Sequence, residues 1–440
     1  MSRPPSFSQF LDTAALVRTF DEDVSESSAI GLDGIKLSQF SEHKFEILTT
    51  ASRKISLGTY EFTRFREKLI SRGSQRTPRV VAIPTIRDRV VLRALNKFLK
   101  TRLGDAIIPR PHSFVKNIKD YLVECSSEHV FVRGDIQSFY DNVEHRDLIR
   151  RLRRRIRTSN ALYLIERALV TPVGVQSGRS HGIPQGLSIS NILANYYLLD
   201  FDAEMKKRAF FVRYVDDFLF IANSNEGETV FREAQTYLNR LDLKIHPIGD
   251  DNAKSEIADV EDGINYLGFR ISRNCISVMD RNRRKMLNSI VGIFREYMRT
   301  GNEPRLILKL TIRIRGCKFN ERKYGWLLFF AQLDDKKLLK RLDNFVSGQF
   351  LRYSISGVRK HVPTFTRAYH QIRYELQDSG VLIDFDEFDV AQKRSFLVRF
   401  TSRSEQEINA MRDEAIGILF RRTVRRETRR MDEELDWQQS

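Results

Sequence analysis

The alternation of apolar and polar positions predicts helices and short strands in mixed order. The first 80 residues are mostly polar, with a helical pattern. The apolar stretch 80–83 then predicts a strand, which Pro84 ends. Thr85, with Asp88 following in the next turn, resembles a capping box, so we expect an amphipathic helix to begin here.

From residue 129 onward the pattern predicts strands bracketed by helices. Segment 130–132 predicts a buried strand that ends at Gly134-Asp135. After about residue 275 the pattern turns helical and stays so to the end. Together these elements predict an α+β fold with a helical C-terminal part. The other elements expected are strands at 210–214, 218–221, 243–247 and 266–272, and helices at 148–157 and 188–199.

Composition narrows the class of protein. The 440 residues include 74 Lys plus Arg against 57 Asp plus Glu, a formal net charge of +17. Such an excess of positive charge indicates a polyanionic partner, most often a nucleic acid. A hydrophobic content of 41% is too high for a disordered chain.

The sequence also bears on the compartment. No apolar run approaches the roughly 18 residues of a membrane helix, and the N-terminus lacks the layout of a signal peptide. Cys125, Cys275 and Cys317 are widely spaced and odd in number, which argues against a disulfide framework or a zinc site. We therefore expect a cytoplasmic protein with no membrane partner.

Two adjacent carboxylates are the first candidate for chemistry. Asp216 and Asp217 lie between the apolar segments 210–214 and 218–221. Unpaired buried carboxylates are costly and neighbouring ones repel, so a hairpin tip that carries both must be solvated or bind cations. Asp135, at the end of another buried strand, is the natural third ligand for a hard divalent ion such as Mg²⁺. The plainer interpretation, that these acids only cap a turn, stays open at this point.

Several ordered motifs give the chain a resemblance to the reverse transcriptase family over roughly residues 30–350. One motif alone would be weak evidence for the resemblance, but the set of motifs follows the family's order and spacing. A departure is Asn191, which stands where the family carries proline. The matching segments are a fingers block at 79–89, the first catalytic block at 135–143, a Pro-Gln-Gly block at 182–190 with Asn195, a Tyr-x-Asp-Asp box at 214–217, Lys254, and a primer-grip turn at 266–269.

This resemblance implies a right-hand polymerase fold and an RNA-directed DNA polymerase that adds dNTPs to a 3′-hydroxyl. The implied parts are an N-terminal region with fingers at 1–120, a palm with an antiparallel sheet at 121–272, a fingers insertion around 146–185, a helical thumb at 273–355 and a basic helical extension at 356–440.

The resemblance also assigns the catalytic acids. Asp135 and Asp216 would bind two Mg²⁺ ions, with Mn²⁺ as the alternative metal, and the Ile136 carbonyl would complete one coordination shell. Two such ions, about 3.5–4 Å apart, would activate the attacking hydroxyl and stabilise the leaving pyrophosphate. Asp217 would support the metals or the primer end.

Further contacts follow from the family's motif positions. Tyr140 would be a steric gate under the sugar, although a packed aromatic is the plainer interpretation, and the adjacent Asp141 resembles an acid of RNA polymerases. Gln185 would contact the template or nucleotide, and Lys254 would protonate the pyrophosphate. The triphosphate would be held by Arg72, Arg76 and Arg79, and the primer by Tyr266, Leu267 and Gly268.

Basic residues crowd two predicted helices, at 150–157 and 281–285. Like charges this dense repel one another, and a phosphate backbone would relieve the repulsion. The plainer interpretation of each cluster is a solvated face. The C-terminal arginines between 421 and 430 form a further stripe that could bind a structured RNA or a neighbouring subunit. The nucleic-acid contacts expected are Arg150, Arg151, Arg154, Arg281, Arg284 and Lys285.

The kind of reverse transcriptase is inferred by analogy alone. No Cys/His endonuclease cluster follows the thumb positions, and the retron signatures are absent. The chain most resembles bacterial unknown-group, defence-associated reverse transcriptases, which implies a noncoding RNA template and an antiphage role. The alternatives are a maturase-like RNA-binding protein, a retron or group II intron-type enzyme without a defence role, and protein-primed or untemplated synthesis. The sequence leaves open whether the chain forms a homo-oligomer.

Overall fold

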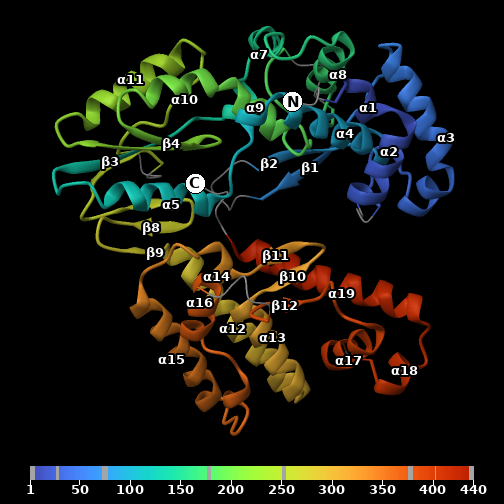
Figure 1. Ribbon diagram of the computed structural model, residues 1–440, viewed down its shortest axis with the longest axis vertical. Coiled ribbons are helices and arrows are strands. Elements are labelled where there is room, and N and C mark those ends of the chain that lie inside the picture. The colour runs from blue at the N-terminus through green and yellow to red at the C-terminus, as the bar shows by residue number, and fades with distance from the viewer. Residues whose placement is uncertain are drawn as a thin grey trace. The chain divides into compact units, whose positions relative to one another are not determined.

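The fold is α+β, as the sequence predicts. The computed structural model describes residues 5–25, 29–71, 78–175, 180–249, 254–374, 380–401 and 403–435 (Figure 1). The chain divides into two compact units, and each is described by itself. The first unit comprises Met1–Pro109 and Val130–Ile257, and the second comprises Arg110–His129 and Ala258–Ser440.

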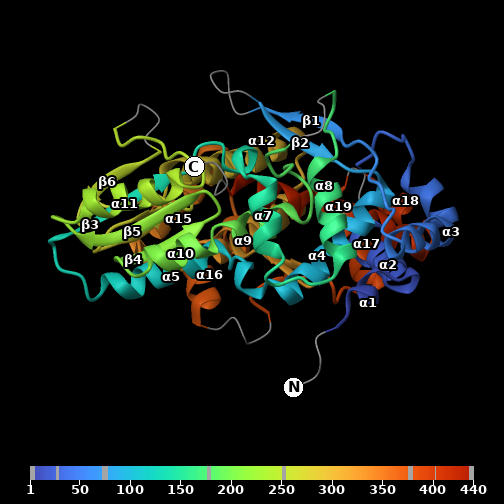
Figure 2. The ribbon, with the colours of Figure 1, turned by 90° about the horizontal axis from the view of Figure 1, so that it is seen from above.

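The N-terminal part of the first unit is helical, as predicted, but it also contains a strand that the pattern did not predict. This strand, β1 (Arg66–Ile70), pairs antiparallel with β2 (Arg79–Ile83), and the two lie side by side in Figure 2. β1 escaped prediction because its sequence, Arg-Glu-Lys-Leu-Ile, is mostly polar and exposed. The helices of this part are α1 (Phe7–Leu11), α2 (Thr13–Thr19), α3 (Leu37–Ser56) and α4 (Ile86–Arg102), with a π-helix at Phe20–Val24.

The predicted start of α4 is confirmed, although its capping box is only half formed. The Thr85 hydroxyl accepts a hydrogen bond of 3.2 Å from the backbone N–H of Asp88, which satisfies one free donor of the helix start. The Asp88 carboxylate does not bond back to Thr85. It accepts instead from the Tyr60 hydroxyl at 2.6 Å and from the Thr63 N–H at 2.9 Å, so it ties the preceding loop to the helix.

A four-stranded sheet in the order β4-β5-β3-β6 forms the centre of the first unit. Helices α10 (Leu199–Met205) and α11 (Gly227–Asn239) pack against β4 and β5 (Figures 1 and 2). The aromatic rings of Phe201, Phe211 and Phe218 meet between helix and sheet. The four strands are β3 (His129–Asp135), β4 (Phe210–Tyr214), β5 (Asp217–Asn223) and β6 (Glu256–Asp259).

Three predicted elements of this unit differ from the structure. The helix expected at 148–157 is α7 (His145–Leu152), which ends early, followed by α8 (Ser159–Val170). The helix expected at 188–199 is divided into α9 (Ser190–Tyr197) and α10. The strand expected at 243–247 is only an isolated bridge between Ile136 and Ile245. These boundaries depend on tertiary pairing, which periodicity does not contain.

The second unit begins with α5 (Pro111–Leu122) and a three-stranded sheet of β7 (Ile264–Tyr266), β8 (Phe269–Ile271) and β9 (Ile276–Val278). The prediction of a single strand at 266–272 is therefore wrong. Leu267 and Gly268 have positive φ angles of 49° and 86° and form a two-residue turn between β7 and β8. Gly268 accepts this conformation without a Cβ clash.

The prediction of an entirely helical C-terminal part is also wrong, because a second small sheet with the order β11-β10-β12 lies there. Its strands are β10 (Cys317–Phe319), β11 (Arg322–Tyr324) and β12 (Ile383–Asp384). The helices are α12 (Asp280–Thr300), α13 (Glu303–Arg315), α14 (Trp326–Phe329), α15 (Lys336–Arg352), α16 (Phe365–Tyr374), α17 (Val390–Phe400), α18 (Glu405–Asn409) and α19 (Asp413–Glu434).

Aromatic side chains contribute to the core of this unit. Trp326 and Phe330 are buried, with ring centroids 4.8 Å apart. A separate cluster that includes Phe385, Phe396 and Phe420 joins α17 and α19. Within the part of the chain that the structure describes, no helix has the length and apolar character needed to cross a membrane.

Candidate active site

Asp216 stands at the tip of the β4–β5 hairpin. Tyr214 pairs with Asp217 across the hairpin, so only Val215 and Asp216 form the turn. Val215 has a φ of 59°, which is unfavourable for a β-branched residue and costs roughly 1–3 kcal/mol. The sequence predicted a three-residue connection over 215–217. The structure instead gives the two acids different positions, because Asp217 belongs to the strand.

The end of β3 lies beside this turn. The backbone N–H of Ile136 donates a hydrogen bond of 2.9 Å to the carbonyl oxygen of Asp216, which joins two segments that are far apart in the sequence. Gly134, just before Asp135, allows the close packing of strands, because a Cβ there would lie 2.2 Å from the ring of Phe218. The structure therefore brings Asp135 and Asp216 together, as the resemblance implied.

The electrostatics of Asp135 and Asp216 indicate negative charge that nearby basic groups compensate only in part. Burial, together with the charge of Asp216, raises the pKa of Asp135 to about 7. Burial and the neighbouring charge of Asp217 likewise raise the pKa of Asp216. A divalent cation between these carboxylates would relieve both effects. Among the described residues no group of three or more His, Cys, Asp or Glu side chains is arranged to hold a metal ion.

Asp217 has a different environment from the other two acids. Arg133 donates from Nε to Oδ1 and from Nη2 to Oδ2 of Asp217, and both distances are 2.9 Å. Burial alone would lower the pKa of Arg133, but the charge and hydrogen bonds of Asp217 outweigh it and raise that pKa above its ordinary value. Sequence reasoning missed Arg133. The available signal was an arginine directly after the apolar residues 130–132 and two residues before Asp135.

Lys254 reaches Asp135 from the segment before β6. Its ammonium donates to Oδ1 of Asp135 at 2.8 Å, and Nε2 of His246 lies 3.2 Å from Lys254 Nζ and 3.3 Å from Asp135 Oδ1. The backbone N–H of Asp135 also donates to the Ser255 hydroxyl at 3.3 Å. Lys254 was predicted as a site residue, whereas His246 was not, because a lone histidine gives no pattern.

Tyr140 lies near the acids, since the charge of Asp216 adds to burial in raising the pKa of the Tyr140 hydroxyl. That hydroxyl donates a hydrogen bond of 2.7 Å to Oδ1 of Asn191. Asn191 is the residue that departs from the family pattern, and it lies in the first turn of α9, the helix that carries Ile192 and Tyr196. The replacement of proline thus provides a hydrogen-bond acceptor that fixes the orientation of the Tyr140 ring.

Gln185 and Gly186 pack closely against β2. The Arg79 guanidinium donates from Nε to the side-chain carbonyl of Gln185, and the Ala82 N–H donates to the backbone carbonyl of Gln185 at 2.7 Å. Gly186 has a φ of +100°, and a Cβ there would lie 2.7 Å from the Ala82 carbonyl oxygen. A glycine is therefore required. The predicted triphosphate ligands Arg72 and Arg76 lie outside the described residues.

The predicted primer-grip residues lie in the second unit. Tyr266 and Leu267 are buried, and the Gly268 carbonyl accepts hydrogen bonds of 3.1 Å from the Met279 N–H and the Asn282 side-chain amide. These bonds fix the β7–β8 turn to the start of α12.

The basic cluster on α7 is partly neutralised within the protein. Arg150 and Arg151 donate to the Asp147 carboxylate at 3.1 and 2.8 Å, and Arg151 also contacts Asp200 at 2.7 Å. Arg154 lies 3.8 Å from Asp200. These ion pairs explain how Arg150 and Arg151 share one helix without a ligand. The basic residues at the start of α12 divide by exposure: Arg281 and Arg284 are exposed, and Lys285 is half-buried.

Comparison with protein families gives one match over this region. The family described as "Reverse transcriptase (RNA-dependent DNA polymerase)" matches residues 70–271. The matched segment holds β2, the central-sheet acids, Tyr140, Gln185, Lys254 and the β7–β8 turn.

Curated proteins and solved structures give more distant similarities. Protein YkfC of Escherichia coli (strain K12) is 24% identical over 292 residues, which cover 55% of this chain and 76% of YkfC. The group II intron-encoded protein LtrA of Lactococcus lactis subsp. cremoris is 27% identical over 176 residues, and the match covers 37% of this chain and 28% of LtrA. A telomerase structure from Candida albicans has a TM-score of 0.45 at 13% identity, covering 86% of this chain and 69% of that one. For apo telomerase from Candida tropicalis the TM-score is 0.40, at 15% identity, covering 92% and 74%.

Proposed function

The chain belongs to the reverse transcriptase family, and from this premise we propose that the whole protein extends a 3′-hydroxyl with dNTPs on an RNA template by metal-ion catalysis. The observation that carries the proposal is the convergence of Asp135 and Asp216, whose raised pKa values mark a site of excess negative charge. Neighbouring carboxylates that repel one another when ionised bind Mg²⁺ or Mn²⁺ readily.

In this proposal Asp135, Asp216 and the Ile136 carbonyl hold the metal ions. Bound metal would polarise the attacking hydroxyl and stabilise negative charge on the leaving group. Asp217 has both carboxylate oxygens bonded to Arg133 and so acts as a positioning residue that fixes β5 against β3. A role for Asp217 as a metal ligand would require that ion pair to open.

The nucleotide would lie between the acids and β2. Tyr140, held by Asn191, would contact the sugar, and Gln185 would contact the base pair. Arg79, released from Gln185, would bind the triphosphate together with Arg72 and Arg76, because arginine forms bidentate bonds to phosphate. Lys254, already bonded to Asp135, would supply a proton to pyrophosphate.

The primer would be gripped by Tyr266, Leu267 and Gly268. The nucleic-acid backbone would be contacted by six basic residues: Arg150, Arg151, Arg154, Arg281, Arg284 and Lys285. In right-hand terms, 1–120 would form the N-terminal region and fingers, 121–272 the palm with its insertion around 146–185, 273–355 the thumb and 356–440 a basic extension. The ion pairs of α7 leave Arg154 and exposed Arg150 as the better phosphate contacts there, and Arg151 as the poorer one.

The finer biological role is a noncoding RNA template and antiphage defence in the bacterial cytoplasm. Support is limited to the motif analogy and to Cys125, Cys275 and Cys317, which are free thiols suited to a reducing compartment. A maturase-like RNA-binding role, or a retron or group II intron-type enzyme without a defence role, is the alternative.

Primer extension tests the activity directly. With an RNA template, a DNA primer, dNTPs and Mg²⁺, the protein should extend the primer, and Asp135→Asn and Asp216→Asn should each abolish extension while leaving the circular dichroism spectrum unchanged. Glu228→Gln, an exposed acid on α11, is the matched control and should extend normally. Extension by Asp216→Asn at the rate of the wild type would overturn the proposal.

The alternatives give different results in two further assays. A maturase-like role predicts that Asp216→Asn retains function in cells while losing polymerisation. Sequencing of co-purified RNA and DNA identifies the template, and a product that stays attached to protein after phenol extraction indicates protein priming.

A further inference from the structure

A cavity of about 600 Å³ in the second unit is lined by an unusual set of side chains. It lies between α13, α15, the short 3₁₀ helix Arg359–His361 and the start of α16. Its volume falls within the roughly 300–1,000 Å³ typical of small-molecule sites. The basic residues that line it are Arg315, Arg359, Lys360, His361 and Arg367.

No carboxylate lines this cavity, and its basic residues have no acidic partner among the residues that the structure describes. Arg359 donates only to neutral acceptors, the Ser347 hydroxyl at 3.2 Å and the Val362 carbonyl at 2.8 Å. The Nε of Arg315 is buried without a hydrogen-bond partner. Leaving a buried donor unsatisfied costs about 1–3 kcal/mol, so the arrangement favours binding of an acceptor.

The Asp343 carboxylate, beside the start of α16, does not neutralise the charge of the cavity. Asp343 on α15 accepts from the backbone N–H groups of Phe365 and Thr366 and from the Thr366 hydroxyl, so both of its oxygens cap α16. The start of α16 is therefore already satisfied, and the positive charge of the cavity comes from its side chains rather than from the helix end.

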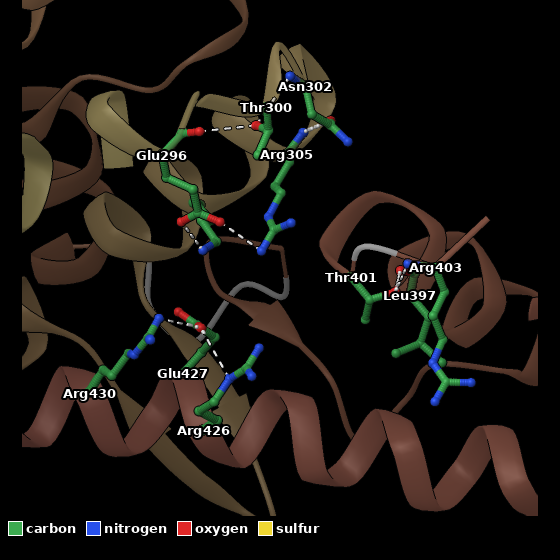
Figure 3. A network of polar contacts seen from close by, with 11 residues as sticks. Glu296, Thr300, Asn302, Arg305, Leu397, Thr401, Arg403, Arg426, Glu427 and Arg430 are labelled. Atoms are coloured by element: carbon green, nitrogen blue, oxygen red, sulfur yellow. Dashed lines mark hydrogen bonds and ion pairs between the residues drawn. The ribbon is translucent and has the colours of Figure 1, made fainter. Parts of the chain in front are cut away.

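Elsewhere in the same unit, several basic residues are paired with carboxylates. Half-buried Arg305 contacts Glu296 at 2.7 Å, and exposed Arg430 contacts Glu427 at 3.1 Å (Figure 3). The buried Lys309 also contacts Glu296, at 2.5 Å. These basic side chains have a carboxylate partner, whereas, in the described part of the chain, those that line the cavity do not.

We propose that this cavity is a second, non-catalytic site for a chain of adjacent phosphate groups. Each phosphate carries about one to two negative charges near neutral pH, so two or three in a row match the four arginine and lysine side chains. Guanidinium groups bind phosphate bidentately, which suits Arg315, Arg359 and Arg367. The same chemistry occurs at the 5′-triphosphate end of an RNA and in a free nucleoside triphosphate.

The binding experiment uses inorganic tripolyphosphate and the full-length protein in EDTA, where metal-dependent nucleotide binding does not contribute. We expect saturable binding that Lys360→Ala/Arg367→Ala weakens at least tenfold. Both residues are exposed, so the variant should keep the wild-type melting temperature. Lys340→Ala/Arg341→Ala removes the same charge from exposed positions of α15 outside the cavity and should change the affinity less than twofold.

Two further measurements separate this site from the polymerase site and identify the source of the phosphates. Arg79→Ala should leave tripolyphosphate binding intact, so the result is independent of the proposed catalytic function. An RNA with a 5′-triphosphate that binds more tightly than both its 5′-hydroxyl counterpart and ATP would assign the site to an RNA end. Equal binding of ATP would assign it to free nucleotide. No tripolyphosphate binding, or equal loss in the cavity and control variants, would overturn the proposal.

Discussion

Arg133 and Asp217 form a buried, bidentate ion pair between the neighbouring strands β3 and β5, with two hydrogen bonds of 2.9 Å. Their exposed fractions are 5% and 1%. The adjacent acids Asp216 and Asp217 therefore differ in environment, because the charge of Asp217 is compensated by Arg133 while Asp216 lies in the turn beside Asp135. The pair fixes the hairpin that presents Asp216.

Arg133→Met should destabilise the fold by roughly 3–5 kcal/mol, because it leaves the Asp217 carboxylate buried without a partner. Urea unfolding measures this loss. The double variant Arg133→Met/Asp217→Leu removes both charges and should recover most of the stability. If the double variant is as unstable as the single one, the loss comes from packing and not from the orphaned charge.

Stability should depend on pH and Mg²⁺ through Asp135. Its pKa is raised to about 7 in the folded protein, whereas the unfolded chain has the ordinary value near 4. Ionisation of Asp135 is therefore less favourable in the folded state than in the unfolded chain. The stability that the protonated Asp135 contributes to the fold is fully present below about pH 4 and is lost as pH rises through 7. Without metal, the melting temperature should fall over this range.

Mg²⁺ should reverse this effect, because it binds the ionised carboxylates. We expect Mg²⁺ at about 10 mM to raise the melting temperature more at pH 8 than at pH 5.5. Asp135→Asn should remove most of the difference, and His246→Gln should retain it. A larger Mg²⁺ effect at pH 5.5 would contradict the assignment.

Tyr140→Ala should increase ribonucleotide incorporation relative to deoxynucleotide incorporation by ~10-fold or more, since a pocket contact of this kind is worth roughly 1–3 kcal/mol. Tyr140→Phe keeps the ring and removes only the hydrogen bond to Asn191, so discrimination should persist. Single-nucleotide extension with matched rNTP and dNTP measures both. Unchanged discrimination in Tyr140→Ala would support the packed-aromatic interpretation.

Glu296→Ala should destabilise the second unit by about 3–5 kcal/mol, because Lys309 is only 7% exposed and would lose its carboxylate partner. Burial already lowers the pKa of Lys309, and the Glu296 hydrogen bond opposes that shift. Thermal melting is the measurement. Glu303→Ala removes an exposed acid from the start of α13 and should cost no more than about 1 kcal/mol.

Much of the candidate site could be predicted from local sequence. The apolar segments around Asp216 predicted the hairpin, and the strand before Asp135 was placed correctly, because burial of a strand leaves a pattern in neighbouring residues. Position in the motif order also identified Lys254, which the structure brings to Asp135. These features depend on a few consecutive residues or on ordered spacing.

Other features depended on partners that are distant in the sequence. Arg133 is bonded to Asp217, Tyr140 to Asn191, and the α7 arginines to Asp147 and Asp200. No local pattern indicates such pairings. The exposed strand β1 likewise has no apolar pattern that would predict it. The sequence alone determined the α+β class and which acids are candidates for the chemistry, because periodicity and motif order are local. Only the tertiary structure decided which charges are neutralised, because ion pairs form between whichever side chains the fold brings together.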